Sequence, residues 1–359
     1  MNTQLDTAVR SEVLKNSRWI RSLGFLSTIL FLFTACPLLA QMMPRQMLTH
    51  AFTLEREGKP APAIAELQAL LDSKSLDDSG VGKAWNVLGL AFQDQGNFSA
   101  SQNAYEHSIR SFEGLPNNIS DYAMALDDFG GLYVDTRQFE LALGLRVKAL
   151  HLYEQINDHT GIANASCDLA GLEFSRNKIN DGKRYLERAL KESKLTKDLD
   201  DDDRAAIASM QGWLAQLNND FLASASSYRQ SLDWWRKRHG EEHPYTGWGY
   251  ILLGNAHAGA GELTTGLNEM KQGIAILSRT LSSENPRYLT AEIAYARVLD
   301  ETGAHSEAAR TKTIAERQLK EFYSSQCLGC TISATAFTKV SSGAQADTNA
   351  SAAANPVQP

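Results

Sequence analysis

Residues 85–105, WNVLGLAFQDQGNFSASQNAY, contain the pattern that decides the fold. A small residue, Gly89, is followed twelve positions later by a second one, Ser101, with a turn-forming Gln-Gly-Asn between them. Large apolar residues surround the first position at helical spacing: Trp85, Leu88 and Phe92. Two antiparallel helices approach to about 8–10 Å only where the side chains at their crossing are small. This stretch therefore predicts a helical hairpin.

The pair of small residues recurs along the chain at intervals of 38 to 42 residues. The first members of the pairs are Ala51, Gly89, Gly130, Ala170, Gly212, Gly254 and Ala296. The second members, each twelve positions later, are Ala63, Ser101, Ala142, Gly182, Ser224, Gly266 and Ala308. A single hairpin of this size cannot bury its apolar faces alone, so neighbouring hairpins must stack into one core. The sequence predicts an all-α solenoid of about seven helical hairpins.

The repeat resembles a known family. Trp85-x2-Leu88-Gly89-x2-Phe92 followed by Ser101-x3-Tyr105 is similar to the tetratricopeptide repeat (TPR) consensus, and the long period resembles its kinesin-light-chain variety. The Gly-x-x-His-Pro element of that variety is matched by residues 240–244, GEEHP. The resemblance covers residues 45–322 and implies a right-handed α-α superhelix with a concave inner wall.

The resemblance also implies a function: a non-enzymatic scaffold or adaptor that binds a partner peptide or protein on the concave face. The inner-wall positions of the family, carried over repeat by repeat, are Lys83, Asn86, Leu90, Gln93, Asp127, Asn164, Trp213, Gln216, Trp248, Asn255 and Arg297. An amide side chain can pair with both the donor and the acceptor of an extended backbone, and tryptophan supplies apolar area. In an alternative interpretation, Trp213 and Trp248 fill the core between adjacent hairpins.

The first forty residues have the layout of an export signal. Basic residues extend to Arg21, and an uncharged run follows from Leu23 to Ala40. Three outcomes stay open: cleavage before Gln41, lipidation at Cys36, or an uncleaved membrane anchor. Each predicts that residues 1–40 direct export, and that the protein is periplasmic, membrane-anchored or extracellular.

The C-terminal segment, residues 323–359, contains a Cys-x-x-Cys pair, Cys327 and Cys330. We expect a local disulfide that caps the final helix, or a pair of unpartnered thiols. The pair also leaves a thiol–disulfide redox protein open as an alternative function. The composition of residues 344–359 predicts a disordered tail.

No catalytic motif is present in the sequence, and no cofactor or metal site is predicted. The net charge of −7 argues against nucleic acid as a partner. The acidic residues 200–203 are expected to begin a helix, where carboxylates accept hydrogen bonds from free backbone amides. A third alternative is a sensor or regulatory component of a signalling complex.

Overall fold

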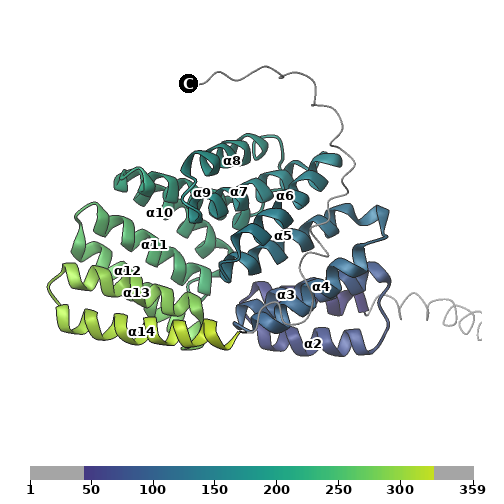
Figure 1. Cartoon of the computed structure of the whole chain (residues 1–359), viewed down its shortest axis with the longest axis horizontal. Helices are drawn as coiled ribbons and strands as arrows, with labels where there is room; N and C mark the ends of the chain where they lie inside the picture. The colour runs from purple at the N-terminus through teal and green to yellow at the C-terminus, as the bar shows by residue number, and fades with distance from the viewer. Residues whose placement is uncertain (1–43, 327–359) are drawn as a thin grey trace, which may run out of the picture.

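The computed structural model describes residues 44–326, which form seven consecutive helical hairpins and no strand (Figure 1). The first hairpin pairs residues 44–56 with α2 (Pro60–Asp72). The other hairpins are α3 (Asp78–Asp94) with α4 (Phe98–Phe112), α5 (Ile119–Asp135) with α6 (Phe139–Gln155), α7 (His159–Ser175) with α8 (Ile179–Glu192), α9 (Asp201–Leu217) with α10 (Phe221–His239), α11 (Pro244–Gly259) with α12 (Leu263–Thr280), and α13 (Pro286–Glu301) with α14 (His305–Ser325). A short 3-10 helix, η1 (Pro116–Asn118), precedes α5. The predicted all-α superhelical solenoid is confirmed.

The paired small residues lie where the two helices of a hairpin cross. Ser101 is fully buried, and its Oγ donates a hydrogen bond of 2.8 Å to the carbonyl oxygen of Gly89. In the sixth hairpin a methyl group on Gly254 would lie 2.6 Å from the carbonyl oxygen of Gly266. The helices are therefore as close as the spacing of small residues predicts.

The acidic residues 200–203 begin α9 as expected. The side chain of Asp200 accepts hydrogen bonds from the backbone amides of Asp202 and Asp203, and the Asp203 side chain accepts one from the amide of Asp200. This reciprocal capping box satisfies three amides that lack partners within the helix. The side chains of His243 and Asn285 cap α11 and α13 in the same region of their hairpins.

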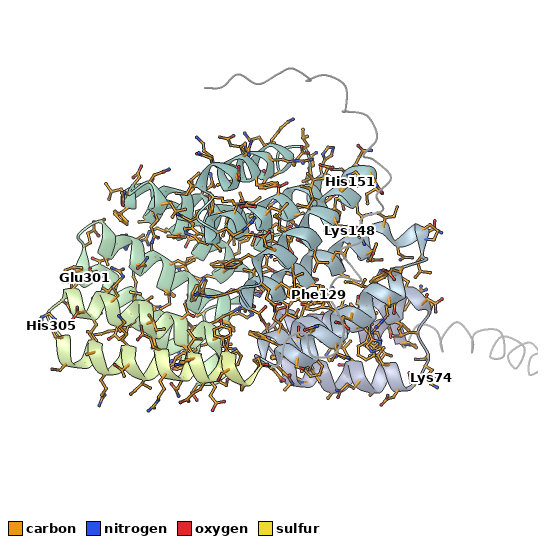
Figure 2. All side chains as sticks on the ribbon, viewed as in Figure 1. Lys74, Phe129, Lys148, His151, Glu301 and His305 are labelled. Atoms are coloured by element: carbon orange, nitrogen blue, oxygen red, sulfur yellow. The ribbon has the colours of Figure 1, made fainter. Side chains whose placement is uncertain are left out.

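A continuous core runs between successive hairpins. Its largest cluster links α4, α5, α6 and α7 through fully buried residues such as Tyr105 and Phe129, whose rings stack with centroids 5.6 Å apart. Figure 2 shows Phe129 in the interior, whereas Lys74, Glu301 and His305 lie at the periphery. The core is thus shared along the solenoid, as repeat packing requires.

The superhelix turns far enough for its last hairpin to contact its second and third. The end of α14 lies beside α3 and α4 (Figure 1), where Phe322 packs edge-to-face on Phe98 at 5.2 Å. The hydroxyl of Tyr323 donates to the carbonyl oxygen of Asp135 at 3.1 Å. We call these two interactions, together with the polar contacts of Asn285, Arg287 and Arg56, the closing contacts.

The polar closing contacts lie at two places in the molecule. At the start of α13, Arg287 Nη1 lies 3.1 Å from Asp94 Oδ1, and Asn285 Nδ2 donates to the Asp94 carbonyl oxygen at 2.9 Å. Across the molecule, Arg56 Nη2 lies 2.5 and 2.6 Å from carboxylate oxygens of Asp200 and Asp202. Together the closing contacts enclose the concave face.

No helix between residues 44 and 326 combines the length and the apolar character that a membrane span requires. The proposed leader, residues 1–40, lies outside the described residues.

Candidate functional site

The closed concave face surrounds a cavity of about 880 Å³. This volume is within the range of about 300–1,000 Å³ that is usual for pockets that bind small ligands. Its most frequent lining groups are carboxyl side chains: Glu55, Asp94, Asp127, Asp128, Asp158, Asp168, Asp202 and Asp203. We call it the acidic cavity.

The helical repeat places these carboxyl groups together. The first helix of each of the first five hairpins contributes at least one of them, from Glu55 in the first helix to Asp203 in α9. First helices line the inner wall of the superhelix, so equivalent positions of successive hairpins face the same space. The carboxyl groups are dispersed over 149 positions of the sequence, residues 55 to 203, and they form one wall in the fold.

Burial and mutual repulsion change the ionisation of this wall. Burial, with repulsion from Asp94 and Asp128, raises the pKa of Glu55 to about 8. Burial likewise raises the pKa of Asp128 to about 6, although the hydrogen bond from Asn86 Nδ2 (2.7 Å) opposes the shift. The pKa of Asp127 is raised above its ordinary range by burial and by Asp168. The cavity is therefore unfavourable for full ionisation of its own carboxyl groups.

The two arginines at the acidic cavity already form ion pairs within the chain. Arg287 binds Asp94, and Arg56 binds Asp200 and Asp202. His243 is 4% exposed and stacks on His239 with ring centroids 4.0 Å apart. Burial, and then repulsion from His239, lowers the pKa of His243 to about 4, so its ring is neutral at pH 7.

A second cavity, of about 560 Å³, adjoins the first. Its wall contains aromatic and sulfur side chains: Met210, Trp213, Tyr228, Trp235, Tyr245, Trp248 and Tyr323. We call it the aromatic cavity. The two cavities share six lining residues, among them Trp235, Tyr245 and Arg287. They form one site with an acidic part and an apolar part.

The structure brings seven of the eleven predicted inner-wall residues to these cavities. Asp127 and Asn164 line the acidic cavity. The aromatic cavity is lined by Gln93, Trp213, Gln216, Trp248 and Asn255. Trp213 also packs edge-to-face on Phe174 at 5.6 Å, and Trp248 packs against the core of the sixth and seventh hairpins. Each tryptophan therefore has both of the predicted roles: it packs against the core, and it lines the aromatic cavity.

The remaining four predicted residues lie beside the cavities. Lys83 forms an ion pair with Asp121 at 3.1 Å, and Leu90 packs against the core cluster of α4–α7. Asn86 is buried. The Arg297 side chain binds Asn255 and Glu301 at the outer edge, where it lines a smaller cavity with Trp213.

The predicted amides have an unexpected role: they connect successive hairpins. Asn86 Nδ2 donates to Asp128, and Gln93 Nε2 donates to Asp135 at 2.8 Å, each across 42 residues. Asn164 Nδ2 donates to Asp203 at 2.9 Å. The other end of Gln93 accepts a hydrogen bond from Tyr105. These amides fix the carboxyl groups of the wall and are less free to bind a peptide backbone than their type suggested.

The sequence interpretation missed most of the acidic wall. Glu55 follows no spacing of the repeat, and Asp203 was assigned only to the helix start. Two signals were available: Asp128 and Asp168 each lie two positions before the first small residue of their repeat, and Asp94 and Asp135 close the first helices of the second and third hairpins at equivalent positions. Cys36, Cys327 and Cys330 lie outside the described residues. Among residues 44–326, no group of three or more His, Cys, Asp or Glu side chains is arranged to hold a metal ion.

Comparisons with known proteins support the fold. No protein-family model matches the sequence, and no curated protein is similar to it in sequence. Solved structures do match. NprR in complex with its cognate peptide NprX has a TM-score of 0.57 at 14% identity, covering 79% of this chain and 83% of NprR.

Two further structures match over nearly their whole length. The apo form of RapI has a TM-score of 0.55 at 15% identity, over 78% of this chain and 99% of RapI. A Rap protein complexed with Competence and Sporulation Factor has a TM-score of 0.52 at 11% identity, over 79% and 98%. Together with the seven stacked hairpins, these similarities show that the chain has the tetratricopeptide-type solenoid fold that its repeat resembles.

Proposed function

We propose that this protein is a non-enzymatic receptor that binds a short peptide, or a peptide segment of a partner protein, in the two joined cavities. The observation that carries the proposal is the pair of joined cavities of ligand size on a concave face whose two sides are held together by the closing contacts. The inner wall of a helical solenoid is the usual place for such recognition.

The composition of the wall supports a peptide ligand. Aromatic side chains supply apolar contact area, and carboxyl and amide groups supply hydrogen-bond acceptors and donors. Two of the similar structures, NprR with NprX and Rap with Competence and Sporulation Factor, contain bound ligands, and that of NprR is a peptide. Their fold is the one found here, which supports ligand binding as the function of this chain.

A retention experiment tests the proposal. The protein is incubated with a random hexapeptide library and passed through a size-exclusion column, and the peptides that co-elute with it are identified by mass spectrometry. Trp248→Ala removes an aromatic wall of the site, and we expect it to reduce retention about tenfold or more, as loss of a central aromatic contact does.

Trp234→Ala is the matched control, because Trp234 is half-buried on α10 against Arg204 and Lys237 and lines neither cavity. Retention should be unchanged in this variant. If no peptide is retained, or if both variants lose retention equally, the proposal is wrong.

We further propose that residues 1–40 export the protein to the cell envelope, on the basis of the basic flank and the apolar run in that segment. Mass spectrometry of the mature amino terminus tests this. A terminus at Gln41 or a lipid on Cys36 would support export, as would an intact chain in the membrane fraction. An intact chain in the cytosolic fraction would contradict it.

A further inference from the structure

The charges of the acidic cavity do not balance. Eight carboxyl groups line it, against two arginines, Arg56 and Arg287. Each arginine is committed to a closing contact, with Asp202 and Asp94 respectively. Arg146 is a third, buried cation at the wall: it pairs with Asp127 at 3.6 Å and Asp168 at 3.8 Å, and its Nη1 donates to the Asp168 carbonyl oxygen at 2.6 Å. Carboxyl groups thus outnumber the basic side chains at this cavity, so a ligand that carries a positive charge would be favoured there.

Asp127 shows how incompletely the donors of the chain satisfy this acidic wall. This residue is 8% exposed and lines the cavity, yet its Oδ1 accepts no hydrogen bond. A buried carboxylate oxygen without a donor is costly, because it loses its water and gains nothing in return. Asp128, next in sequence, also lines the cavity. It accepts a hydrogen bond from Asn86, and the nearest cationic donor to Asp127 Oδ1 is Arg146 Nε at 3.6 Å, which has no hydrogen-bond partner either. A further positive charge in the cavity would stabilise the ionised form of these carboxyl groups.

The aromatic cavity defines a second requirement. Trp213, Trp248 and Met210 form an apolar wall that is joined to the acidic cavity through Trp235 and Tyr245. An apolar side chain gains about 1.5–3 kcal/mol when it is buried in such surroundings. The two cavities adjoin, so one short ligand can reach both.

We infer that the ligand is a short peptide that places a basic side chain, lysine or arginine, in the acidic cavity and an apolar side chain in the aromatic cavity. This inference rests on the proposed function and names the chemistry of its ligand. The cation stabilises the ionised carboxyl groups of the acidic wall. An acidic peptide is rejected, because it would add negative charge to a wall that is already crowded with carboxyl groups.

Three peptide pools test the inference. Each consists of acetylated and amidated hexapeptides with random apolar residues around one central residue, which is Lys in the first pool, Gln in the second and Glu in the third. Retention by the full chain is measured by size exclusion and mass spectrometry. We expect the Lys pool to be retained about tenfold or more above the Gln pool, and the Glu pool to be retained least.

The variants Asp127→Asn and Asp128→Asn keep the shape of the wall, and each removes a carboxyl group that a bound cation would hold in its ionised form. In both, retention of the Lys pool should fall toward that of the Gln pool, while retention of the Gln pool changes little. Glu113→Gln, at an exposed position after α4, is the control and should leave the preference intact. Thermal melts confirm that each variant is folded.

The outcomes separate the two proposals. If the Gln or Glu pool is retained as well as the Lys pool, and Trp248→Ala still abolishes retention, the charge preference is wrong and the peptide receptor stands. A uniform loss across all pools in both aspartate variants would also overturn the charge preference. If no pool is retained by the wild-type chain, both proposals fall.

Discussion

At the scale of single residues, the glycines of this chain differ in what surrounds them. Gly254 lies at the helix crossing of the sixth hairpin, where a methyl group would meet the Gly266 carbonyl oxygen and Met270 Cγ, both at 2.6 Å. Gly131, inside α5, has nothing nearer than Arg146 Nη2 at 3.6 Å. The helix crossing requires glycine at position 254, whereas position 131 has room for a larger side chain.

Gly254→Ala should therefore destabilise the protein by about 1–3 kcal/mol, because the backbone of the neighbouring helix must move to admit the methyl group. Gly131→Ala should be neutral or should stabilise by up to about 1 kcal/mol, through helix propensity. The free energies of unfolding from urea titrations measure both. Equal effects of the two substitutions would contradict the packing described here.

The raised pKa values of the acidic cavity predict how stability depends on pH. The pKa of Glu55 is raised from 4.5 to about 8, and those of Asp128 and Asp203 are raised from 3.8 to about 6. Between the ordinary and the raised values the folded chain binds more protons than the unfolded chain, so the free energy of unfolding falls as pH rises. The pKa values of Asp200 and Asp202 are lowered, but their opposite effect acts below about pH 4. The pKa of His243, lowered to about 4, also opposes the trend between about pH 4 and 6.5, where one histidine is set against three acids.

Without ligand, the midpoint of thermal unfolding should be higher at pH 5 than at pH 8. Glu55→Gln removes the group with the widest titration window and should reduce this difference. Melting curves at several pH values measure it. A midpoint that rises from pH 5 to pH 8 would show that these carboxyl groups are not held in the buried, repulsive environment described.

At the scale of elements, the end of α14 also packs against another hairpin, because Phe322 contacts Phe98 of α4 and closes the superhelix. Phe322→Ala should cost about 1–3 kcal/mol, less than a fully buried phenylalanine because Phe322 is only half-buried. Ile314→Ala, on the exposed side of the same helix, is the matched control and should cost under about 1 kcal/mol.

Hydrogen exchange distinguishes this role from a general loss of stability. In Phe322→Ala we expect faster exchange at the end of α14 and in the turn between α3 and α4, with the other hairpins protected as in the wild type. Faster exchange that is spread evenly over all hairpins would contradict a local closing role.

The helical hairpins could be predicted from sequence because their cause is local. Twelve residues separate Gly89 from Ser101, and the contact between them is within one hairpin. The closing contacts could not be predicted in the same way. Asn285 and Asp94 are 191 residues apart, and their meeting depends on small rotations that accumulate over several hairpins.

The candidate site was predicted in part for the same reason. The family register places Trp213, Gln216 and Trp248 on the inner wall, and they line the aromatic cavity. The partners of the inner-wall amides lie one hairpin further along, as with Asn86 and Asp128. The register within one repeat does not predict hydrogen bonds between successive hairpins. Most of the acidic wall was therefore identified only from the structure.

At the scale of the whole molecule, the closing arginines hold two sides of the superhelix together. The double variant Arg56→Gln, Arg287→Gln removes the charge-assisted bonds to Asp200, Asp202 and Asp94. Hydrogen bonds of this kind contribute about 1.5–3 kcal/mol each. The double variant should therefore open, and its radius of gyration in small-angle X-ray scattering should increase.

Arg310→Gln, at an exposed position on α14, controls for the loss of positive charge. Its radius of gyration should equal that of the wild type. An unchanged radius in the double variant would show that the apolar closing contact at Phe322 suffices to hold the superhelix closed.

Linear repeat proteins commonly lose their terminal units first, because each unit is held by its neighbours alone and the outermost ones have a single neighbour. In this chain the end of α14 is anchored to the second and third hairpins. The last unit thus gains a further neighbour, and stepwise fraying from the carboxyl end is suppressed. We expect denaturation to follow one sharp transition instead of the broad, sequential melting of an open array.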